Sequence, residues 1–419
     1  MTMLSLAWQS ARSRRYALLL TLGSIILSVA LLLAVERLRH GARDSFTAAL
    51  SGTDLIVGPR SHPVQLLLYS VFHIGETDAG MTWDSVERIG AHPAVAWTIP
   101  LTLGDTHRGF PVVATTTAYF DHYRHGRAQA LAFSSGSRFN GLFDVVIGAE
   151  VARRLGYRLG DELTLSHGAG HAGHADHEDK PFTVVGILAA TGTPVDRTLH
   201  IGLPAMEAIH LDWHGGAHVP GVSIGRAELR KFDLHPKQVT AVLVGLKQRA
   251  AVLRMQRMFG ADAKEALSAV IPGVALQQLW DITGAAERVL RAVSFLVLVV
   301  ALTGLAAAVL AGLGERRREL AILRAVGARP RQISLLLVCE GLGLTIAGAA
   351  AGFALVEMAS FALAPLALAK WGLAIGAFAP GPGEVWLLAA VVGAGLIASV
   401  VPGVRAYRLS LIDGLAPKV

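Results

Sequence analysis

Four apolar runs of membrane-spanning length constrain the fold of this chain more than any other feature. The first, Tyr16 to Val35, contains no charged residue. A helix needs about 20 consecutive apolar residues to cross the hydrocarbon core of a bilayer. Three later runs are of similar length and lie at 292–313, 333–356 and 385–404. We therefore expect an α-helical membrane protein with transmembrane helices at 16–35, 292–313, 333–356 and 385–404.

The composition agrees with a membrane protein that also carries a sizeable polar domain. Of the 419 residues, 53% are hydrophobic and only 16% are charged. A soluble chain carries about 25% charged residues. The net charge is +7, and much of the basic excess lies beside the apolar runs, so it indicates membrane orientation rather than nucleic-acid binding. The one cysteine, Cys339, excludes an intramolecular disulfide and a cysteine-based zinc site.

The N-terminal segment has two interpretations. Residues 1–15 mix apolar and basic side chains, which is typical of an interfacial helix on the cytoplasmic membrane surface. A basic start followed by an apolar run also occurs in cleaved signal peptides. However, the run is too long for a signal peptide, and LAVERLRH offers no small-x-small cleavage site. We expect an uncleaved anchor with its N-terminus in the cytoplasm.

Residues 36–291 hold no spanning run and alternate short apolar stretches with turn residues. This pattern predicts a large extracytoplasmic α/β (α+β) domain inserted between the first two spans. We expect strands at 54–57, 94–103, 144–147, 161–166, 182–188 and 238–245. We expect helices at 83–91, 149–155, 247–259 and 263–268, and a helical stem at 277–291 leading into the second span.

The segment between the second and third spans, 314–332, is short and strongly basic. Leu320, Leu323 and Val326 recur at helical spacing, and Gly327 and Pro330 are natural stop signals for a helix. Basic loops beside spans lie on the cytoplasmic side. The basic tail, 405–419, belongs there too, so both chain ends are cytoplasmic. The proline-containing stretch 357–384 is expected to be an outer loop.

Four sequence stretches resemble one known family. ERRRELAILRAVGARPRQI, residues 315–333, resembles the cytoplasmic loop of FtsX/MacB-like ABC-transporter permeases. VVIGAEVARRLGYRLGDELTL and PFTVVGILAATGTPVD, which start at Val145 and Pro181, resemble the extracytoplasmic core domain of MacB-like permeases. The closing VPGVRAYRLSLIDGLAPKV resembles the end of family members.

The resemblance implies a permease subunit of an ABC transporter in the bacterial inner membrane. In this family the cytoplasmic loop docks on a separate ATPase, two permease copies pair, and ATP hydrolysis drives the external domains by mechanotransmission. The cargo is exported or extracted, and a metal-related substrate is one candidate. The residues that the resemblance assigns to ATPase coupling are Glu315, Arg316, Arg317, Arg318, Glu319, Leu320, Leu323, Arg324, Gly327 and Arg329.

No catalytic motif accompanies these features. The phosphate-binding pattern GxxxxGK[ST] is absent from the sequence, so ATP and Mg²⁺ are expected on a partner chain rather than on this one. The patterns GxSxG and HExxH are also absent, so we expect no enzyme activity here. Two other functions stay open: a non-transport regulator of a periplasmic partner such as a cell-wall hydrolase, and a metal-responsive membrane sensor.

Histidines gather in two segments of the extracytoplasmic domain. HGAGHAGHADHED and HLDWHGGAH contain His167, His171, His174, His177, His210, His214 and His218. Neutral imidazoles bind Zn²⁺, Cu²⁺ or Ni²⁺, and histidine-rich tracts often hold metals. Zinc is the expected ion, because it tolerates flexible sites made of histidines and carboxylates. The alternative is a surface insertion whose histidines bind nothing specific.

Small residues recur at four-residue spacing in the last two spans. Gly348 and Gly352 form one pair, and Gly395 and Ser399 form another. Such residues allow helix backbones to approach closely in a membrane. The spacing fits packing between two permease copies and packing within one copy equally well.

Overall fold

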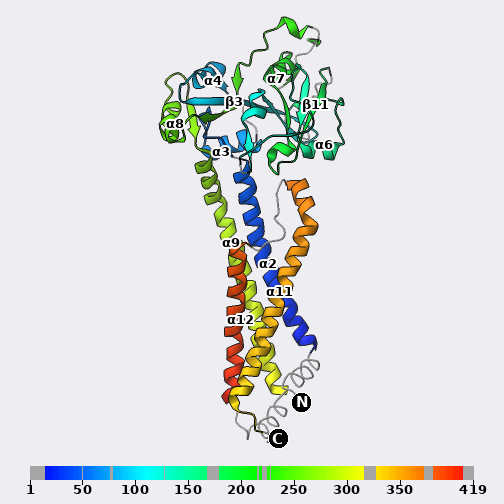
Figure 1. Cartoon of the computed structure of the whole chain (residues 1–419), viewed down its shortest axis with the longest axis vertical. Helices are drawn as coiled ribbons and strands as arrows, with labels where there is room; N and C mark the ends of the chain where they lie inside the picture. The colour runs from blue at the N-terminus through cyan, green and yellow to red at the C-terminus, as the bar shows by residue number, and fades with distance from the viewer. Residues whose placement is uncertain are drawn as a thin grey trace. The chain divides into compact units, whose positions relative to one another are not determined.

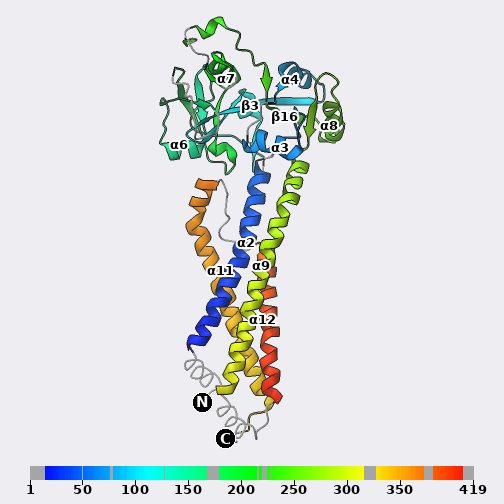
Figure 2. The ribbon, with the colours of Figure 1, turned by 180° about the vertical axis from the view of Figure 1, so that it is seen from behind.

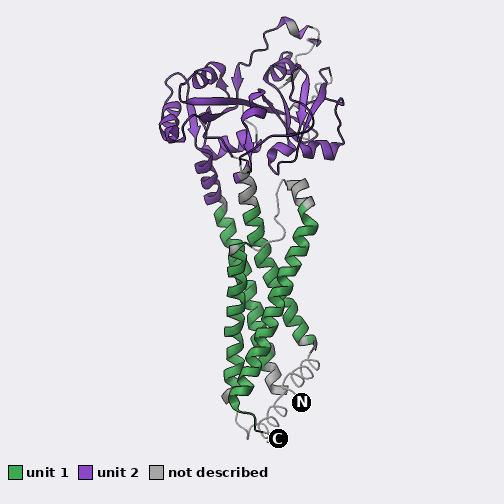
Figure 3. Cartoon of the chain, in the orientation of Figure 1, with its two compact units in different colours: residues 1–41, 284–366, 375–419 green, residues 42–283, 367–374 purple. Residues whose placement is uncertain are grey.

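The computed structural model describes residues 15–49, 51–75, 79–126, 128–167, 179–214, 217–218, 224–226, 228–315, 327–371 and 381–408. The chain divides into two compact units, shown in Figure 3. We call residues 1–41, 284–366 and 375–419 the helical unit. Residues 42–283 and 367–374 form the α/β unit.

The helical unit is built on long helices that run alongside one another (Figures 1 and 2). They are α2 (Arg15–Ala48), α9 (Pro272–Glu315), α11 (Pro330–Trp371) and α12 (Pro382–Arg408). In the described part of the chain, 4 helices are long and apolar enough to cross a membrane, at Leu18–Gly41, Gly284–Ala307, Pro330–Ala364 and Gly383–Arg405. The expected number and order of spans are confirmed.

The core of the helical unit draws side chains from each of these helices. Ile25 and Val29 of α2, Leu305 of α9, Leu337 of α11 and Val391 of α12 are almost fully buried together. Other large apolar side chains, such as those of α9, point outward and are exposed. An apolar outer surface around an apolar core is what a helix bundle in lipid presents.

The helices extend beyond the expected spans, and one expectation was wrong. The stretch 357–384 was expected to be an outer loop, but α11 continues to Trp371 and α12 begins at Pro382. Pro365, a proline of that stretch, lies inside α11. Its neighbours are mostly Ala and Leu, which form helices readily enough to continue past the proline. The predicted interfacial helix at 1–15 lies outside the described residues except for Arg15, and so does the tail after Arg408.

The α/β unit is organised around a mixed sheet. Among the described residues it has 11 strands in the order β17-β1-β16-β3-β4-β12-β8-β11-β7, with β10 on β3 and β9 on β11. Its strands are β1 (Leu55–Pro59), β3 (Val95–His107), β4 (Phe110–Thr115), β7 (Phe133–Gly136), β8 (Asp144–Ile147), β9 (Glu162–Leu163), β10 (Ser166–His167), β11 (Phe182–Leu188), β12 (Leu199–Gly202), β16 (Ala241–Leu246) and β17 (Leu267–Val270). Most neighbours are antiparallel, but β12 runs parallel to β4 and β11 parallel to β8.

Short strand pairs and helices complete this unit. The pairs are β2 (Met81–Thr82) with β15 (Gln238–Val239), β5 (Arg124–His125) with β6 (Gln129–Ala130), and β13 (Trp213–His214) with β14 (Ala217–His218). The helices are α3 (Pro63–Leu67), α4 (Trp83–Gly90), α5 (Ala118–His122), α6 (Ala149–Leu155), α7 (Leu203–His210) and α8 (Val252–Gly260). Single turns are η1 (Leu68–Phe72), η2 (Pro194–Arg197), η3 (Leu229–Lys231) and η4 (Arg249–Ala251).

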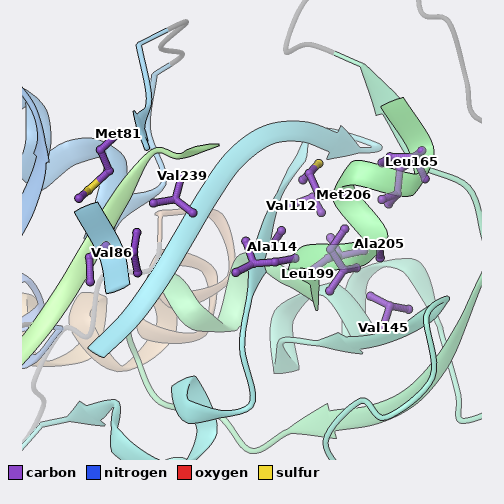
Figure 4. Packing of buried hydrophobic residues seen from close by; sticks show 14 of the residues in the cluster. Met81, Val86, Val112, Ala114, Val145, Leu165, Leu199, Ala205, Met206 and Val239 are labelled. Carbon is purple, nitrogen blue, oxygen red and sulfur yellow. The ribbon is translucent and has the colours of Figure 1, made fainter. Parts of the chain in front are cut away.

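Each face of the sheet buries its own apolar cluster. On one face, Val145 and Leu199 of adjacent strands lie beside Ala205 and Met206 of α7 (Figure 4). The other face packs against α3, η1, α5 and the first turns of α9. This two-sided burial explains β16, where every residue is buried, and it is why that strand reads as a continuous apolar run. By contrast, β11 alternates buried and half-buried positions.

One glycine of the family-like stretch is required by a close backbone approach. A Cβ on Gly148, at the junction of β8 and α6, would lie 2.3 Å from the carbonyl oxygen of Val195. No side chain fits at that distance, so η2 can pack on the start of α6 only over a glycine. This contact joins the two sequence stretches that resemble the MacB-like core domain.

Most of the expected elements of this unit are confirmed, the expected strand at 161–166 is divided into β9 and β10, and one element is wrong. The strands at 144–147 and 182–188 and the helix at 149–155 have the expected bounds. The stretch 263–268 was expected to be helical, but it leads into β17, which pairs with β1. Here pairing with a strand about 200 residues earlier overrides the helix propensity of a short alanine-containing segment.

Candidate functional site

The connection between α9 and α11 holds the predicted ATPase-coupling residues. Glu315 is the last residue of α9 and Pro330 the first of α11. Gly327 has φ of 103°, a conformation that favours glycine, and the Gln332 side chain accepts a hydrogen bond from the Arg329 backbone N–H at 2.8 Å. Arg316, Arg317, Arg318, Glu319, Leu320, Leu323 and Arg324 lie outside the described residues.

The small residues of the last two spans pack helices within one chain. A Cβ on Gly348 would lie 2.5 Å from Ile25 of α2, and one on Gly352 would lie 2.9 Å from the Ile26 carbonyl oxygen. Gly395 stands in the same relation to Thr345 of α11, at 2.4 Å. Ser399 is fully buried against Gly341 of α11. Of the two interpretations left open by the spacing, packing within one copy accounts for these residues.

A buried charge cluster links three of the long helices. The Arg37 guanidinium of α2 donates from Nε to Glu384 Oε1 of α12 at 2.7 Å and from Nη2 to Glu384 Oε2 at 3.2 Å. It also donates to Glu357 and, at 3.2 Å, to Ser360 Oγ, both on α11. The guanidinium lies over the Phe353 ring, 5.7 Å from its centroid.

Sequence analysis missed this cluster, although a signal was present. Arg37 follows the first apolar run, Glu357 follows the third, and Glu384 precedes the fourth. These positions fall at the same end of an antiparallel bundle, where opposite charges can meet. The expected outer loop at 357–384 contains both glutamates, so the sequence pattern does not place them beside Arg37.

Two residues of the second histidine segment, His210 and Asp212, pair with charged residues outside it. His210 Nδ1 donates to the Met206 carbonyl oxygen at 2.9 Å, and Nε2 lies 3.4 Å from Asp105 Oδ1. Burial alone would lower the pKa of His210, but the Asp105 carboxylate raises it above its ordinary value. The geometry therefore favours the doubly protonated imidazolium, which is not the form that ligates a metal.

Asp212, two residues later, pairs with a buried lysine. Lys180 Nζ lies 2.6 Å from Asp212 Oδ1, and both side chains have an exposed fraction of 0%. Burial would raise the pKa of Asp212, but the Lys180 ammonium outweighs burial and lowers it. The pair fastens the N-terminal end of β11 to the segment between α7 and β13.

The two ends of the first histidine segment meet the second one. Its entry strand β10 pairs with β3, with His167 opposite Asp105, the residue that holds His210. Its exit is Lys180, which holds Asp212. His171, His174 and His177 lie outside the described residues, and for His167, His214 and His218 only the backbone is described. Among the described residues, no group of three or more His, Cys, Asp or Glu side chains is placed to hold a metal ion.

Comparison with known proteins identifies the architecture. A family model described as the MacB-like periplasmic core domain matches residues 18–251, and the model of the FtsX-like permease C-terminal matches 291–411. The chain belongs to the MacB/FtsX-like permease family. This permease is thus an ABC-transporter permease-type chain and a multi-pass membrane protein with a large α/β domain between its first and second spans.

Individual relatives are distant. The permease is 23% identical over 406 residues to the macrolide export ATP-binding/permease protein MacB of Nitrobacter winogradskyi. The match covers 95% of this chain and 57% of that protein. Among solved structures, it resembles the periplasmic region of MacB from Actinobacillus actinomycetemcomitans with 10% identity and a TM-score of 0.32, covering 56% of this chain and 96% of that one. It also resembles the extracellular domain of the noncanonic ABC-type transporter YknZ from Gram-positive bacteria, with 11% identity and a TM-score of 0.31. That match covers 52% of this chain and 98% of the other.

The α/β unit of the permease also buries a polar cluster that sequence analysis did not single out. His200 of β12 is fully buried between Tyr119 and Phe120 of α5, with ring centroids 4.9 Å and 6.1 Å away. Neither of its ring nitrogens makes a hydrogen bond of normal geometry, and neither does the Tyr119 hydroxyl. His73, at the end of η1, binds the Thr198 hydroxyl through Nδ1 at 2.9 Å.

Burial sets the protonation of this cluster. It lowers the pKa of His73 from 6.5 to about 4. It also lowers the pKa of His200 to about 3, with a further contribution from nearby His73. Burial raises the pKa of Tyr119 and of Tyr123 far above their ordinary values. His73 and His200 are therefore both neutral at neutral pH.

Proposed function

We propose that this chain is the membrane subunit of an ABC transporter, and that a separate ATPase docks on residues 314–332. The observation that carries the proposal is the continuity of two helices. Both α2 (Arg15–Ala48) and α9 (Pro272–Glu315) contain residues of the helical unit and of the α/β unit without a break. Rigid secondary elements carry coupling between distant sites. Since α9 ends where the coupling segment begins, a force applied to that segment reaches the α/β unit along one helix.

The partners follow from the same arrangement. ATP and Mg²⁺ are bound by the ATPase, whose movement on the basic segment displaces α9 and α11. The basic residues at 314–332 and 405–419 orient both chain ends toward the cytoplasm of a bacterial inner membrane. Two copies of the chain pair with two ATPase copies, and the α/β units move to export or extract a substrate. The Nitrobacter relative is an ATP-binding/permease protein, which supports the pairing of these two activities.

Charge reversal in the coupling segment tests this proposal. We expect Arg317→Glu with Arg318→Glu to reduce recovery of the ATPase with the affinity-tagged chain at least tenfold, while membrane insertion is unchanged. Arg405→Glu at the end of α12 is the matched control, because it reverses a basic charge at the other cytoplasmic segment and should leave recovery unchanged. Recovery of the ATPase by the double variant at the level of the parent would refute the docking site.

A specific observation favours zinc binding as a second activity. The ends of the first histidine segment are fastened beside the second segment, through His167 opposite Asp105 and through Lys180 bound to Asp212. Anchors of this kind reduce the conformational freedom that a loop loses when it binds an ion. We propose that His171, His174 and His177, with His167, His214 or His218, bind zinc. His210 joins them only if it gives up its contact with Asp105.

Calorimetry with zinc chloride on the full-length chain in detergent tests the metal proposal. The matched variant changes His167, His171, His174 and His177 to alanine. Micromolar or tighter binding by the parent that the variant loses supports it. Absent or equal binding refutes it and leaves the transporter proposal untouched.

A further inference from the structure

The Arg37 cluster differs from an ordinary surface ion pair. The side chains of Arg37 and Glu384 have an exposed fraction of only 7%, and that of Glu357 is 22%. The hydrogen bonds of Arg37 link α2 to α11 and α12, because its partners Glu357 and Glu384 lie 320 and 347 residues later in the sequence. Removing charges from water is costly, so a buried cluster of this kind persists only when geometry and hydrogen bonding are good.

The chemistry of the cluster requires an arginine. Its planar guanidinium offers donors in a fixed fork, so it can bind Glu384 in a bidentate manner while another N–H reaches Glu357. A lysine supplies the same charge as a point and does not reproduce this fork. One cation is therefore shared between two carboxylates that belong to different helices, α11 and α12.

The position of the cluster along α2 gives it mechanical significance. Arg37 lies four residues before Gly41, the last residue of this helix that belongs to the helical unit. Every hydrogen bond that the structure describes for the Arg37 side chain goes to α11 or α12. Nearby Arg39 contacts Glu36 and His40 of its own helix instead. The ion pairs of Arg37 thus connect α11 and α12 to α2, close to the end of the part of α2 that belongs to the helical unit.

We propose that Arg37 is a positioning residue that couples α11 and α12 to α2, so that their displacement moves α2 and, with it, the α/β unit. This inference rests on the proposed function, because it assumes that an ATPase drives α11. It adds a second route to the α/β unit, through α2, beside the direct route through α9. The first route uses the covalent chain, whereas the second depends on Glu357 and Glu384 holding Arg37.

A cross-linking experiment tests whether Arg37 holds α2 close to α12. In a chain with Cys339→Ala, cysteines replace His40 of α2 and Gly383 of α12, where a Cβ at 383 would lie 3.8 Å from His40 Nε2. A short bifunctional thiol reagent then reports how close the two helices stay. We expect Arg37→Glu to slow cross-linking at least tenfold, and Arg39→Glu, the matched control, to leave it within about threefold of the parent.

Charge exchange separates a specific pairing from general damage. Arg37→Glu combined with Glu384→Arg again places one guanidinium between two carboxylates on the same three helices. We expect this exchange to restore cross-linking to within about threefold of the parent. Parent-like cross-linking in the single Arg37→Glu variant would overturn the inference that the ion pairs of Arg37 hold α2 close to α12. Failure of the exchange to restore cross-linking would overturn it too.

The coupling role is tested with nucleotide in the assembled complex. We expect a non-hydrolysable ATP analogue to change the cross-linking rate of the parent at least threefold. Arg37→Lys should recover the ATPase as the parent does, yet lose this response. A lysine variant that responds like the parent overturns the coupling role alone. Failure of the parent chain to recover any ATPase overturns the proposed function, and the coupling role with it.

Discussion

Acidification should destabilise the α/β unit through two buried histidines. His73 and His200 have exposed fractions of 8% and 0%, and burial holds their pKa values at about 4 and about 3. In the unfolded chain both return to the ordinary value of 6.5. As the pH falls below 6.5, the unfolded state takes up protons that the folded state refuses, so stability decreases. The loss is complete only when the pH passes below the folded pKa values.

The size of the effect follows from these values. Between about pH 7 and about pH 4.5, each histidine removes about 2–3 kcal/mol from the free energy of unfolding. Asp196, next to this cluster, changes the stability in the opposite direction on acidification. Burial raises the pKa of its carboxyl, so lowering the pH favours the folded state at this group. It offsets part of the loss. Tyr119 and Tyr123 do not titrate in this range, since burial raises their pKa values.

Urea unfolding of the full-length chain in detergent, followed by tryptophan fluorescence, measures this dependence. We expect His200→Leu to reduce the acid loss by about 2–3 kcal/mol. At neutral pH it should unfold at the same urea concentration as the parent or a higher one, because the imidazole that it removes makes no hydrogen bond of normal geometry. His235→Leu, at an exposed position, is the matched control and should keep the parent's pH dependence. An equal acid loss in His200→Leu and the parent would refute the reasoning.

Two further predictions concern packing and buried charge. Gly395→Ala places a Cβ 2.4 Å from Thr345 and should destabilise the helical unit by about 1–3 kcal/mol, whereas Gly393→Ala meets nothing within 4 Å and should not. Thermal unfolding followed by circular dichroism in detergent compares the two, and equal midpoints would contradict the packing. Lys180→Met leaves the Asp212 carboxylate buried without its cation, which should cost the α/β unit about 3–5 kcal/mol. Adding Asp212→Leu should recover most of that stability in urea unfolding, and a double variant no better than the single one would show that the pair is not responsible.

The sequence by itself determined the features that depend on local pattern and on the bilayer. A membrane limits a spanning segment to an apolar helix of nearly fixed length, so the four spans could be placed from hydrophobicity alone. The elements Asp144–Ile147, Ala149–Leu155 and Phe182–Leu188 were also predictable, because each combines a clear apolar period with a glycine or turn at its end. The family-like stretches indicated the MacB-like core domain because each of them is a contiguous piece of sequence, which can be recognised without the fold.

Only the tertiary structure decided which distant residues meet. The stretch that includes Leu267 became a strand because it pairs with β1, and His210 faces Asp105 of β3. The structure also packs Gly348 and Gly395 within one chain, a choice that their spacing left open. The Arg37 cluster joins helices more than 300 residues apart, and a burial of charge that is costly in isolation persists because three helices supply its partners together. Local pattern specifies which face of an element is apolar, but the partner of that face is fixed only when the whole chain folds.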